Sequence, residues 1–367
     1  MTSNQLEIFP HHIAHNFHVV QKVAGVPVMP VLKADGYGLG AAFMATLLQK
    51  EGAQSFAVSR MKEVQALREA GITQEILLMA PCATQADARA TIALNLTATI
   101  ASPFDAQLLS EQATAAGREI PVHLKLDTGF GRYGFLPGEW EQALHAVRLP
   151  GLVCQGIYSH LFESFAKRTR HTFTQKKEFD RTVARLKLSG LAPCTLHLAN
   201  SCAALRFPDM RYDRVRVGSA LVGRVSIANA WDLRPACLLR AQITQVRLLP
   251  RGHNIGYAHR YATKRPTRIG VVPIGLYDGV AVADNSSPQS IRGLLRNGRE
   301  DVGALVHKRH PTAFWNGQKL PVLGRVGTTA LVLDLSHHPV QPGDLVAFSV
   351  NPMLVNGSLD RIYSENE

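Results

Sequence analysis

The feature that most constrains the fold is an alternation of short apolar runs with amphipathic stretches between residues 26 and 219. The runs are almost continuously apolar, as expected of parallel strands that are covered on both faces. The stretch 61–71 has Val64, Leu67 and Ala70 on one helical face and ends at Gly71, a residue that favours helix termination; 173–190 is a second helical stretch. The apolar runs are 26–33, 55–60, 76–81, 96–102, 121–127, 152–160, 194–200 and 212–219.

These eight strand–helix units predict an α/β fold, an N-terminal (β/α)8 barrel of the TIM type. After residue 233 the pattern changes to β runs separated by turn signals such as "NGQ", which predicts a C-terminal mostly β domain. We therefore expect domains at 1–233 and 234–367, and the sequence leaves open whether the first ten or so residues pack with the second. The β runs are 241–249, 268–275, 302–307, 330–336 and 344–350.

Charge and composition exclude several functional classes. The net charge is +12, but the basic residues are spread along the chain with no basic helix, so we expect a cationic site for small anions and no nucleic-acid partner. No run approaches the ~20 apolar residues of a membrane helix, and the N-terminus has no secretory signal. The five cysteines lack metal or disulfide spacing. We therefore expect a cytoplasmic protein with no membrane partner.

Polar residues stand at the carboxyl ends of several predicted strands, which is where (β/α)8 enzymes place their active sites. Such a convergence on otherwise apolar strands predicts the active site. The residues are Lys33 after the first run, Lys125, Asp127 and Arg132 with the fifth, His160 with the sixth, His197, Asn200 and Ser201 with the seventh, and Arg216, Gly218 and Ser219 with the eighth.

The chemistry of this set is cationic. It contains no cluster with metal-ligand spacing, so we expect no catalytic metal, and the chain has no nucleophile elbow or Walker motif. Gly218 and Ser219 follow the eighth strand, the usual barrel position for a phosphate bound by backbone N–H groups. A lysine able to form a Schiff base, a phosphate site and no metal together suggest pyridoxal 5′-phosphate.

Five motifs in order resemble those of the alanine racemases, and the resemblance covers almost the whole chain. The resemblance implies a pyridoxal 5′-phosphate enzyme with a barrel and a β domain. It also implies a head-to-tail homodimer and an amino-acid substrate. The motifs are "VLKADGYGLG" (31–40), "HLKLDTGFGRYGF" (123–135), "HLANSCAAL" (197–205), "RVRVGSALVG" (214–223) and "NIGYAHRYATKRPTRIGVVPIGLYDG" (254–279).

The same resemblance implies roles for individual residues. Lys33 would hold the cofactor and act as one acid/base, and Tyr257, reaching over from the partner subunit, would be the second base. Arg132 would orient Tyr257 and bind substrate, with His160 behind Tyr257. Arg216 would face the pyridine nitrogen with support from His197, and Lys125 matches a lysine that is often carbamylated. The cofactor-binding set would be Lys33, Tyr37, Asn200, Ser201, Arg216, Gly218, Ser219 and Tyr363.

The chemistry of racemisation explains these residue types. Two bases on opposite faces can remove and return the Cα proton without rotating the substrate. Lysine and tyrosine side chains in water have pKa values of ~10, which a cationic pocket lowers. Arginine cannot give up its proton, so Arg216 would bind the pyridine nitrogen without protonating it, which limits side reactions.

Departures from the family pattern leave the substrate open. Gly327, Thr328, Thr329 and Ala330 stand where the family has Cys-Met-Asp-Gln, although the Thr328 amide could still bind a carboxylate. Tyr277 is displaced by one position, and the C-terminus is short. The leading hypothesis is an alanine racemase that supplies D-alanine for peptidoglycan. The alternatives are a broader racemase for serine, lysine or ornithine, a decarboxylase of the same architecture, and a non-enzymatic cofactor-binding protein.

Overall fold

The computed structural model describes residues 4–259, 261–282 and 311–364. The chain divides into two compact units. One is Pro10–Ala236, and the other combines Met1–Phe9 with Cys237–Glu367. The later boundary thus falls between residues 236 and 237, where the sequence suggested 233 and 234.

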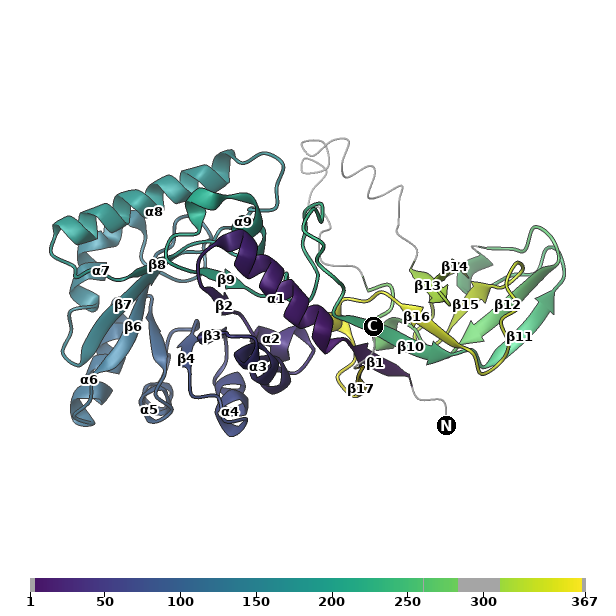
Figure 1. Ribbon diagram of the computed structural model, residues 1–367, viewed down its shortest axis with the longest axis horizontal. Helices are drawn as coiled ribbons and strands as arrows, with labels where there is room; N and C mark the ends of the chain where they lie inside the picture. Colours follow the sequence, from purple (N-terminus) through teal and green to yellow (C-terminus); the bar gives the residue numbers. More distant parts are fainter. Residues whose placement is uncertain (1–3, 260, 283–310, 365–367) are drawn as a thin grey trace. The chain divides into compact units, whose positions relative to one another are not determined.

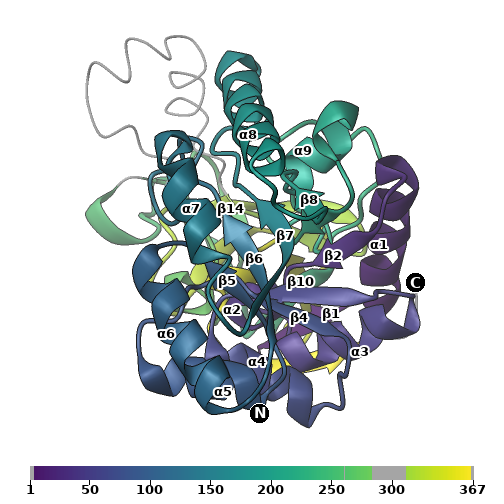
Figure 2. The ribbon, with the colours of Figure 1, turned by 90° about the vertical axis from the view of Figure 1, so that its left-hand side faces the viewer.

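The first unit is a parallel barrel of eight strands, and Figures 1 and 2 show the helices that surround it. Strands β3 to β8 form one six-stranded sheet, and β2 pairs with β9. A bridge between Val31 and Ala57 joins β2 to β3, and the Arg216 amide donates to the Ala199 carbonyl oxygen at 3.0 Å to join β9 to β8. The strands are β2 Val28–Pro30, β3 Ser55–Val58, β4 Glu75–Leu78, β5 Thr97–Ile100, β6 Ile120–Lys125, β7 Leu152–Tyr158, β8 Thr195–His197 and β9 Val215–Val217.

Each of the eight apolar runs overlaps one of these strands, so the predicted fold class is confirmed. The predicted helices are also present, as α4 and α8. A buried apolar cluster of Met29, Val31, Ala57 and Leu77 fills part of the barrel. The helices are α1 Pro10–Ala24, α2 Lys33–Tyr37, α3 Ala41–Lys50, α4 Met61–Glu69, α5 Gln85–Ala93, α6 Pro103–Ala115, α7 Trp140–Ala146, α8 Arg170–Leu188 and α9 Ser201–Arg206.

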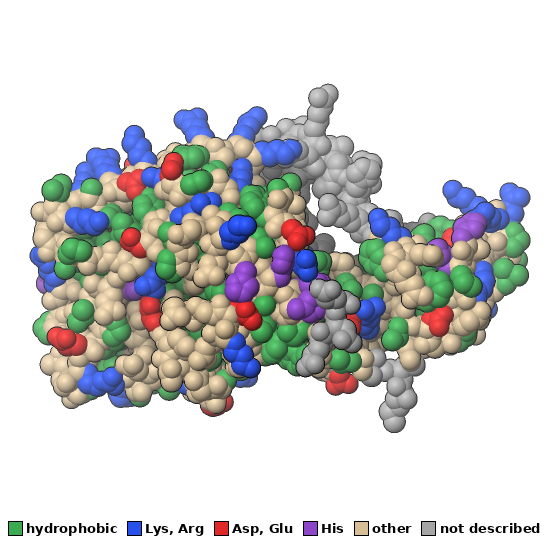
Figure 3. Space-filling view, in the orientation of Figure 1, with side chains coloured by type: hydrophobic (Ala, Val, Ile, Leu, Met, Phe, Trp, Pro, Cys, Tyr) green, Lys and Arg blue, Asp and Glu red, His purple; other side chains and the backbone are tan. Residues whose placement is uncertain are grey.

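Helix α8 corrects one expectation, because it is a basic helix. Its Lys and Arg residues outnumber its acids, Glu178 and Asp180, and Figure 3 shows the basic side chains gathered over it. The feature is hard to recognise in the sequence because a buried stripe that includes Phe179 and Val183 interrupts the charges along the chain. The basic residues of α8 are Arg170, Lys176, Lys177, Arg181, Arg185 and Lys187.

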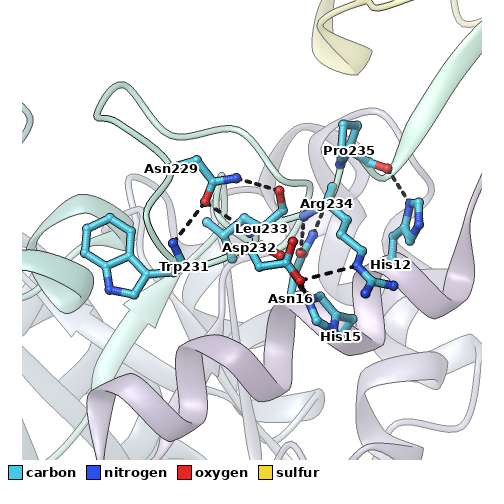
Figure 4. A network of polar contacts seen from close by, with 9 residues as sticks. All are labelled: His12, His15, Asn16, Asn229, Trp231, Asp232, Leu233, Arg234 and Pro235. Carbon is cyan, nitrogen blue, oxygen red and sulfur yellow. Dashed lines mark hydrogen bonds and ion pairs between the residues drawn. The ribbon is translucent and has the colours of Figure 1, made fainter. Parts of the chain in front are cut away.

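Helix α1 holds the segment that leads out of the barrel (Figure 4). The wholly buried Asn16 side chain donates to the carbonyl oxygens of Leu221 and Arg234 at 3.0 and 2.8 Å, and accepts from the Arg234 amide at 2.7 Å. Ring nitrogens of His12 and His15 hydrogen-bond the carbonyl oxygens of Pro235 and Asp232. This exit segment is therefore fixed on the barrel side by side chains of one helix.

The second unit is a mostly β domain, as predicted. Its sheet has the order β11-β12-β15-β14-β13-β16-β10-β1-β17, in which β1 lies between β10 and β17. The predicted run 302–307 lies outside the described residues. The strands are β1 Gln5–Ile8, β10 Cys237–Gln242, β11 Gln245–Leu249, β12 Thr267–Val272, β13 Thr312–Trp315, β14 Gln318–Leu323, β15 Leu331–Asp334, β16 Leu345–Phe348 and β17 Asp360–Tyr363.

Four of these strands lie outside every predicted run: β1, β13, β14 and β17. The run 241–249 covers β11 but only the last two residues of β10. The turn "NGQ" marked the β13–β14 hairpin, in which Asn316 and Gly317 have φ values of 46° and 75°. Asn-Gly is the preferred pair for such a two-residue turn. In the part of the chain that the structure describes, no helix is long and apolar enough to cross a membrane.

Candidate active site

A cavity of about 540 Å³ opens at the carboxyl ends of the barrel strands. Its wall includes ten of the residues proposed from the sequence, all from the barrel unit. His197 is wholly buried and does not reach the wall. The ten are Lys33, Tyr37, Lys125, Arg132, His160, Asn200, Ser201, Arg216, Gly218 and Ser219.

Lys33 opens the short element α2, whose backbone forms a left-handed turn and not a regular α-helix. The four residues that follow Lys33, 34 to 37, have φ values of 54°, 54°, 63° and 57°. A left-handed turn costs an ordinary residue roughly 1–2 kcal/mol, so the surroundings must hold it. The buried Glu63 carboxylate does so, accepting from the Ala34 amide at 2.7 Å and from the Ser59 and Arg60 amides at 2.8 and 3.0 Å.

The left-handed turn explains the residue types at positions 35 and 36. Aspartate tolerates the left-handed region, and the Asp35 side chain accepts from the Ala41 amide at 2.9 Å where helix α3 begins. A Cβ on Gly36 would lie 3.0 Å from Met44 Cγ and 3.1 Å from the Ala41 nitrogen. The two residues therefore suit a tight left-handed turn packed on α3.

The surroundings of Lys33 favour its neutral amine. Burial lowers the pKa of Lys33, the positive charge of Arg132 lowers it further, and Glu63 opposes both. Its Nζ lies 5.8 Å from the ring centre of Tyr37. An amine with a lowered pKa can act as a nucleophile or a base nearer neutral pH.

Tyr37, Ser201 and Gly218 make a compact polar corner. A Cβ on residue 218 would lie 2.3 Å from Tyr37 Oη, so only glycine lets the phenol approach the backbone there. The Ser201 hydroxyl oxygen accepts from the Gly218 and Ala220 amides at 3.2 and 3.3 Å, which leaves its own hydrogen to donate elsewhere. Burial raises the pKa of Tyr37 to about 12, so the phenol keeps its proton and can donate to an anion.

Arg216 is a buried cation that forms no ion pair with a carboxylate in the described part of the chain. Its guanidinium donates to the carbonyl oxygens of His197 and Ser159 at 2.7 and 2.6 Å, and to His197 Nδ1 at 3.0 Å. Burial lowers the pKa of Arg216 only to about 10, so it remains charged at neutral pH. It can therefore donate a hydrogen bond into the cavity to a neutral acceptor.

Lys125 and His160 are two basic groups of the cavity wall whose pKa values are lowered. Burial and the charge of Arg216 lower the pKa of Lys125 to about 7; its Nζ donates to the Leu126 carbonyl oxygen at 3.2 Å. Burial and then Arg216 lower the pKa of His160 well below its usual value. His160 is thus a neutral ring at neutral pH, packed edge-on against Phe130 with 4.9 Å between ring centres.

The loop that carries Arg132 is organised by Asp127. Its carboxylate accepts from the backbone amides of residues 129 to 132 at 2.7–3.0 Å. Burial alone would raise the pKa of Asp127, but these four hydrogen bonds outweigh it and lower the pKa. The Arg132 guanidinium packs over the Phe130 ring at 4.5 Å. Asp127 is thus part of the frame that presents Arg132.

Sequence reasoning missed His123 and Tyr158. Both point into the barrel, as the two-residue alternation with Lys125 and with His160 could have indicated. Tyr158 stacks on His197 with ring centres 4.9 Å apart and bonds Thr99 at 2.8 Å through its hydroxyl. Tyr158 also lines the cavity.

The remaining proposed residues, Tyr257, Thr328 and Tyr363, belong to the β-rich unit. Tyr257 begins a one-turn 3-10 helix, Tyr257–His259, and is 72% exposed. Thr328 is exposed, and its carbonyl oxygen accepts from the Tyr277 amide at 2.9 Å. Tyr363 ends β17 and is half-exposed. Their catalytic and binding roles stay predictions.

The chain has a barrel with a basic cavity, a lysine at the cavity wall and a β-rich second unit. These features define a class of two-domain enzymes. Their site suits an anionic carbonyl compound, because the lysine amine can react with the carbonyl group and the cations can bind the anion. Comparisons with known proteins name the family. The family model for the alanine racemase N-terminal domain matches residues 8–225, and that for the C-terminal domain matches residues 236–354. The chain belongs to the alanine racemase family.

Individual relatives agree. The chain is 36% identical over 284 residues to an alanine racemase of Synechocystis, covering 75% of this chain and 76% of the relative. It is 32% identical over 353 residues to an alanine racemase of Nostoc, covering 93% and 85%. The crystal structure of alanine racemase from a D-cycloserine-producing Streptomyces lavendulae matches with a TM-score of 0.84 and 25% identity, covering 100% of this chain and 98% of that one.

Proposed function

We propose that this protein is a pyridoxal 5′-phosphate-dependent racemase that interconverts L- and D-alanine and supplies D-alanine for peptidoglycan. The family membership supports the reaction. The observation that carries it is the cavity, whose wall includes both Lys33 and the buried Arg216, and Arg216 forms no ion pair with a carboxylate of the described residues. An arginine there is what a racemase needs and a decarboxylase would not use, because arginine cannot protonate a ring nitrogen.

The residues present fit the cofactor. The bare backbone at Gly218 leaves the Tyr37 hydroxyl and Ser201 side by side, and together with the Ser219 amide they would hold a phosphate. Arg216 would donate to the pyridine nitrogen, and Lys33 would attach to the aldehyde carbon. The half-exposed Tyr363 would add a second phenol to the phosphate. Asn200 would act indirectly, because its side chain accepts from the Ala203 amide at 3.1 Å and shapes the turn before α9.

Pyridoxal 5′-phosphate, when bound, withdraws electrons from the substrate and acidifies its Cα proton. The chain supplies the rest. Lys33 Nζ holds or releases the proton on one face, favoured by its lowered pKa. Tyr257 Oη would do so on the other face, from a partner subunit of a head-to-tail homodimer. Arg132 and the Thr328 amide would orient the substrate carboxylate, and the neutral His160 would sit beside the second base.

Lys125 would contribute to the same site by holding the Arg132 side chain in place. Its pKa of about 7 leaves much of the amine neutral at neutral pH, and a neutral amine is the form that can add carbon dioxide. A carbamate on Lys125 would turn a cation beside Arg132 into an anion and hold the guanidinium. We place the racemase in the cytoplasm.

The test is a chiral assay of the purified protein with pyridoxal 5′-phosphate against alanine, serine, lysine and ornithine. We expect D-alanine from L-alanine at a higher kcat/KM than any other product. No D-product from any amino acid would overturn the racemase proposal. A faster reaction with a long basic side chain would overturn the assignment to alanine alone.

Arg216→Glu tests the role of the arginine. A carboxylic acid at that position can share its proton with a pyridine nitrogen, so we expect slower racemisation and more transamination and decarboxylation products. Arg216→Lys is the matched control, because it keeps the charge and should give few side products. Unchanged racemisation with unchanged fidelity in Arg216→Glu would contradict this role.

A further inference from the structure

A line of polar side chains continues from Arg216 through the inside of the barrel. His197 Nε2 lies 3.0 Å from His123 Nδ1, and His123 Nε2 lies 3.8 Å from Glu75 Oε1. The other oxygen of Glu75 accepts from Arg214 Nη1 at 2.8 Å. Glu75 is the first residue of β4 and Arg214 precedes β9, so the line ends at the amino-terminal ends of the strands, opposite the cavity.

The hydrogen bonds along this line are all donated in the same direction, from Arg216 toward Glu75. Arginine only donates, so His197 Nδ1 must accept from Arg216. A neutral His197 then carries its proton on Nε2 and donates to His123 Nδ1. His123 in turn carries its proton on Nε2, facing Glu75.

Both rings are neutral, as this direction requires. Burial and then Arg216 lower the pKa of His197 well below its usual value. Burial, and then Arg214 and Arg216, lower the pKa of His123 to about 3. Each ring therefore holds a single proton, and its position is set by its neighbours.

The far end of the line offers a matching acceptor. Glu75 Oε1 is buried and has no hydrogen-bond partner among the described residues, whereas Arg214 holds the other oxygen. The His123 ring is confined, because a Cβ on Gly156 would lie 2.7 Å from it. Glu75 therefore presents a carboxylate oxygen to a ring that has little room to turn.

We propose that Glu75, held by Arg214, is a remote positioning residue for Arg216. It selects the Nε2–H tautomer of His123 and, through it, that of His197, so that His197 Nδ1 stays an acceptor for the Arg216 guanidinium. Without the carboxylate the opposite tautomers become accessible, and an Nδ1–H on His197 would oppose Arg216. The effect on catalysis rests on the proposed function; the tautomers do not.

Glu75→Gln tests this in the full-length protein with bound pyridoxal 5′-phosphate. Arg214 would donate to the oxygen of the new side-chain amide, so the amide NH2 group would face His123 Nε2. This would favour the opposite tautomer of His123. The matched control is Glu7→Gln, which removes a similar Arg–Glu pair, Glu7–Arg240 at 2.6 Å, in the β-rich unit. If Glu75→Gln does not fold, Arg214→Lys loosens the same carboxylate more gently.

The first readout is the side-chain ¹⁵N shifts of the histidines, assigned with His123→Gln and His197→Gln. We expect both rings to be protonated on Nε2 in the parent protein and in Glu7→Gln, and at least His123 to shift toward Nδ1–H in Glu75→Gln. The second is the kinetics, in which kcat should fall about tenfold with KM nearly unchanged, a loss typical of outer-shell substitutions.

Unchanged histidine signals in Glu75→Gln or Arg214→Lys would overturn the proposal. So would a fall in kcat no larger than that of Glu7→Gln, since a merely structural role predicts that result. If the parent protein failed to racemise alanine while the tautomers shifted as expected, the proposed function would fall and the role of Glu75 in fixing the tautomers would stand.

Discussion

The two proposed bases stand on very different stretches of backbone. Lys33 opens a left-handed turn tied down by the carboxylates of Glu63 and Asp35, whereas Tyr257 opens a 3-10 turn and is 72% exposed. The position of Lys33 is thus fixed by the fold of its own unit. Tyr257 must gain its precision from something that packs against it, which is what a head-to-tail dimer would supply.

The largest effect should come from removing either base. We expect Lys33→Ala and Tyr257→Phe each to lower kcat by about 10³-fold or more, the range in which a positioned acid or base contributes. Lys33→Ala should also abolish the absorbance of the attached cofactor, and Tyr257→Phe should keep it. A Tyr257→Phe protein that racemises alanine at the parent rate would remove Tyr257 from the mechanism.

Mixing these two inactive variants sharpens the comparison. If Lys33 and Tyr257 of one site come from different subunits, a mixed dimer has one site with both bases intact. Unfolding and refolding the mixture together should therefore restore part of the activity, and each variant refolded alone should not recover. No recovery in a mixture that demonstrably forms mixed dimers would place both bases on one chain.

Glycine substitutions compare the two turns directly. Gly36→Ala puts a Cβ 3.0 Å from Met44 Cγ at φ 63°, whereas at Gly256, φ 77°, the nearest atoms are 3.5 Å away. We expect Gly36→Ala to lower the free energy of unfolding by about 3 kcal/mol, from strain plus overpacking, and Gly256→Ala by about 1 kcal/mol, from strain alone. Chemical denaturation measures both. Equal losses would show that the Lys33 turn is no more tightly held.

A smaller effect is expected at Asp35. Asp35→Ala loses the acceptor for the Ala41 amide and places alanine at φ 54°, at a cost of about 2 kcal/mol. Asp35→Asn keeps an acceptor and tolerates the left-handed region, so it should stay within about 0.5 kcal/mol of the parent. Thermal unfolding distinguishes the two, and a loss of equal size in both would assign the effect to charge instead of capping.

The sequence predicts the barrel well and the β-rich unit less well, for physical reasons. A strand buried on both faces is continuously apolar, so the run 55–60 identified β3 without knowledge of its neighbours. Strand β1 is short, and its place between β10 and β17 depends on segments more than 200 residues away. Strand β14 contains Pro321, which weakened its pattern.

The site shows the same division. Lys33 and Arg216 follow from their positions at strand ends, but the left-handed turn at Lys33 and the link from His197 to His123 depend on side chains that the fold alone brings together. Tyr257 was found only through motif resemblance. Its local sequence forms an exposed turn that carries no signal of catalysis.

The last prediction concerns the charge that opposes the lowered pKa of Lys33. Glu63 raises the pKa of Lys33 against burial and Arg132, so Glu63→Gln should lower that pKa further. The neutral amine then persists to lower pH. Attachment of pyridoxal 5′-phosphate to the apoprotein requires that neutral amine, so the pH midpoint of the attachment rate should move down. Glu51→Gln, which removes a carboxylate paired with His18 in the same unit, is the control and should leave the midpoint in place. A midpoint that moves to higher pH in Glu63→Gln would show that Glu63 acts on Lys33 through the backbone of its turn and not through its charge.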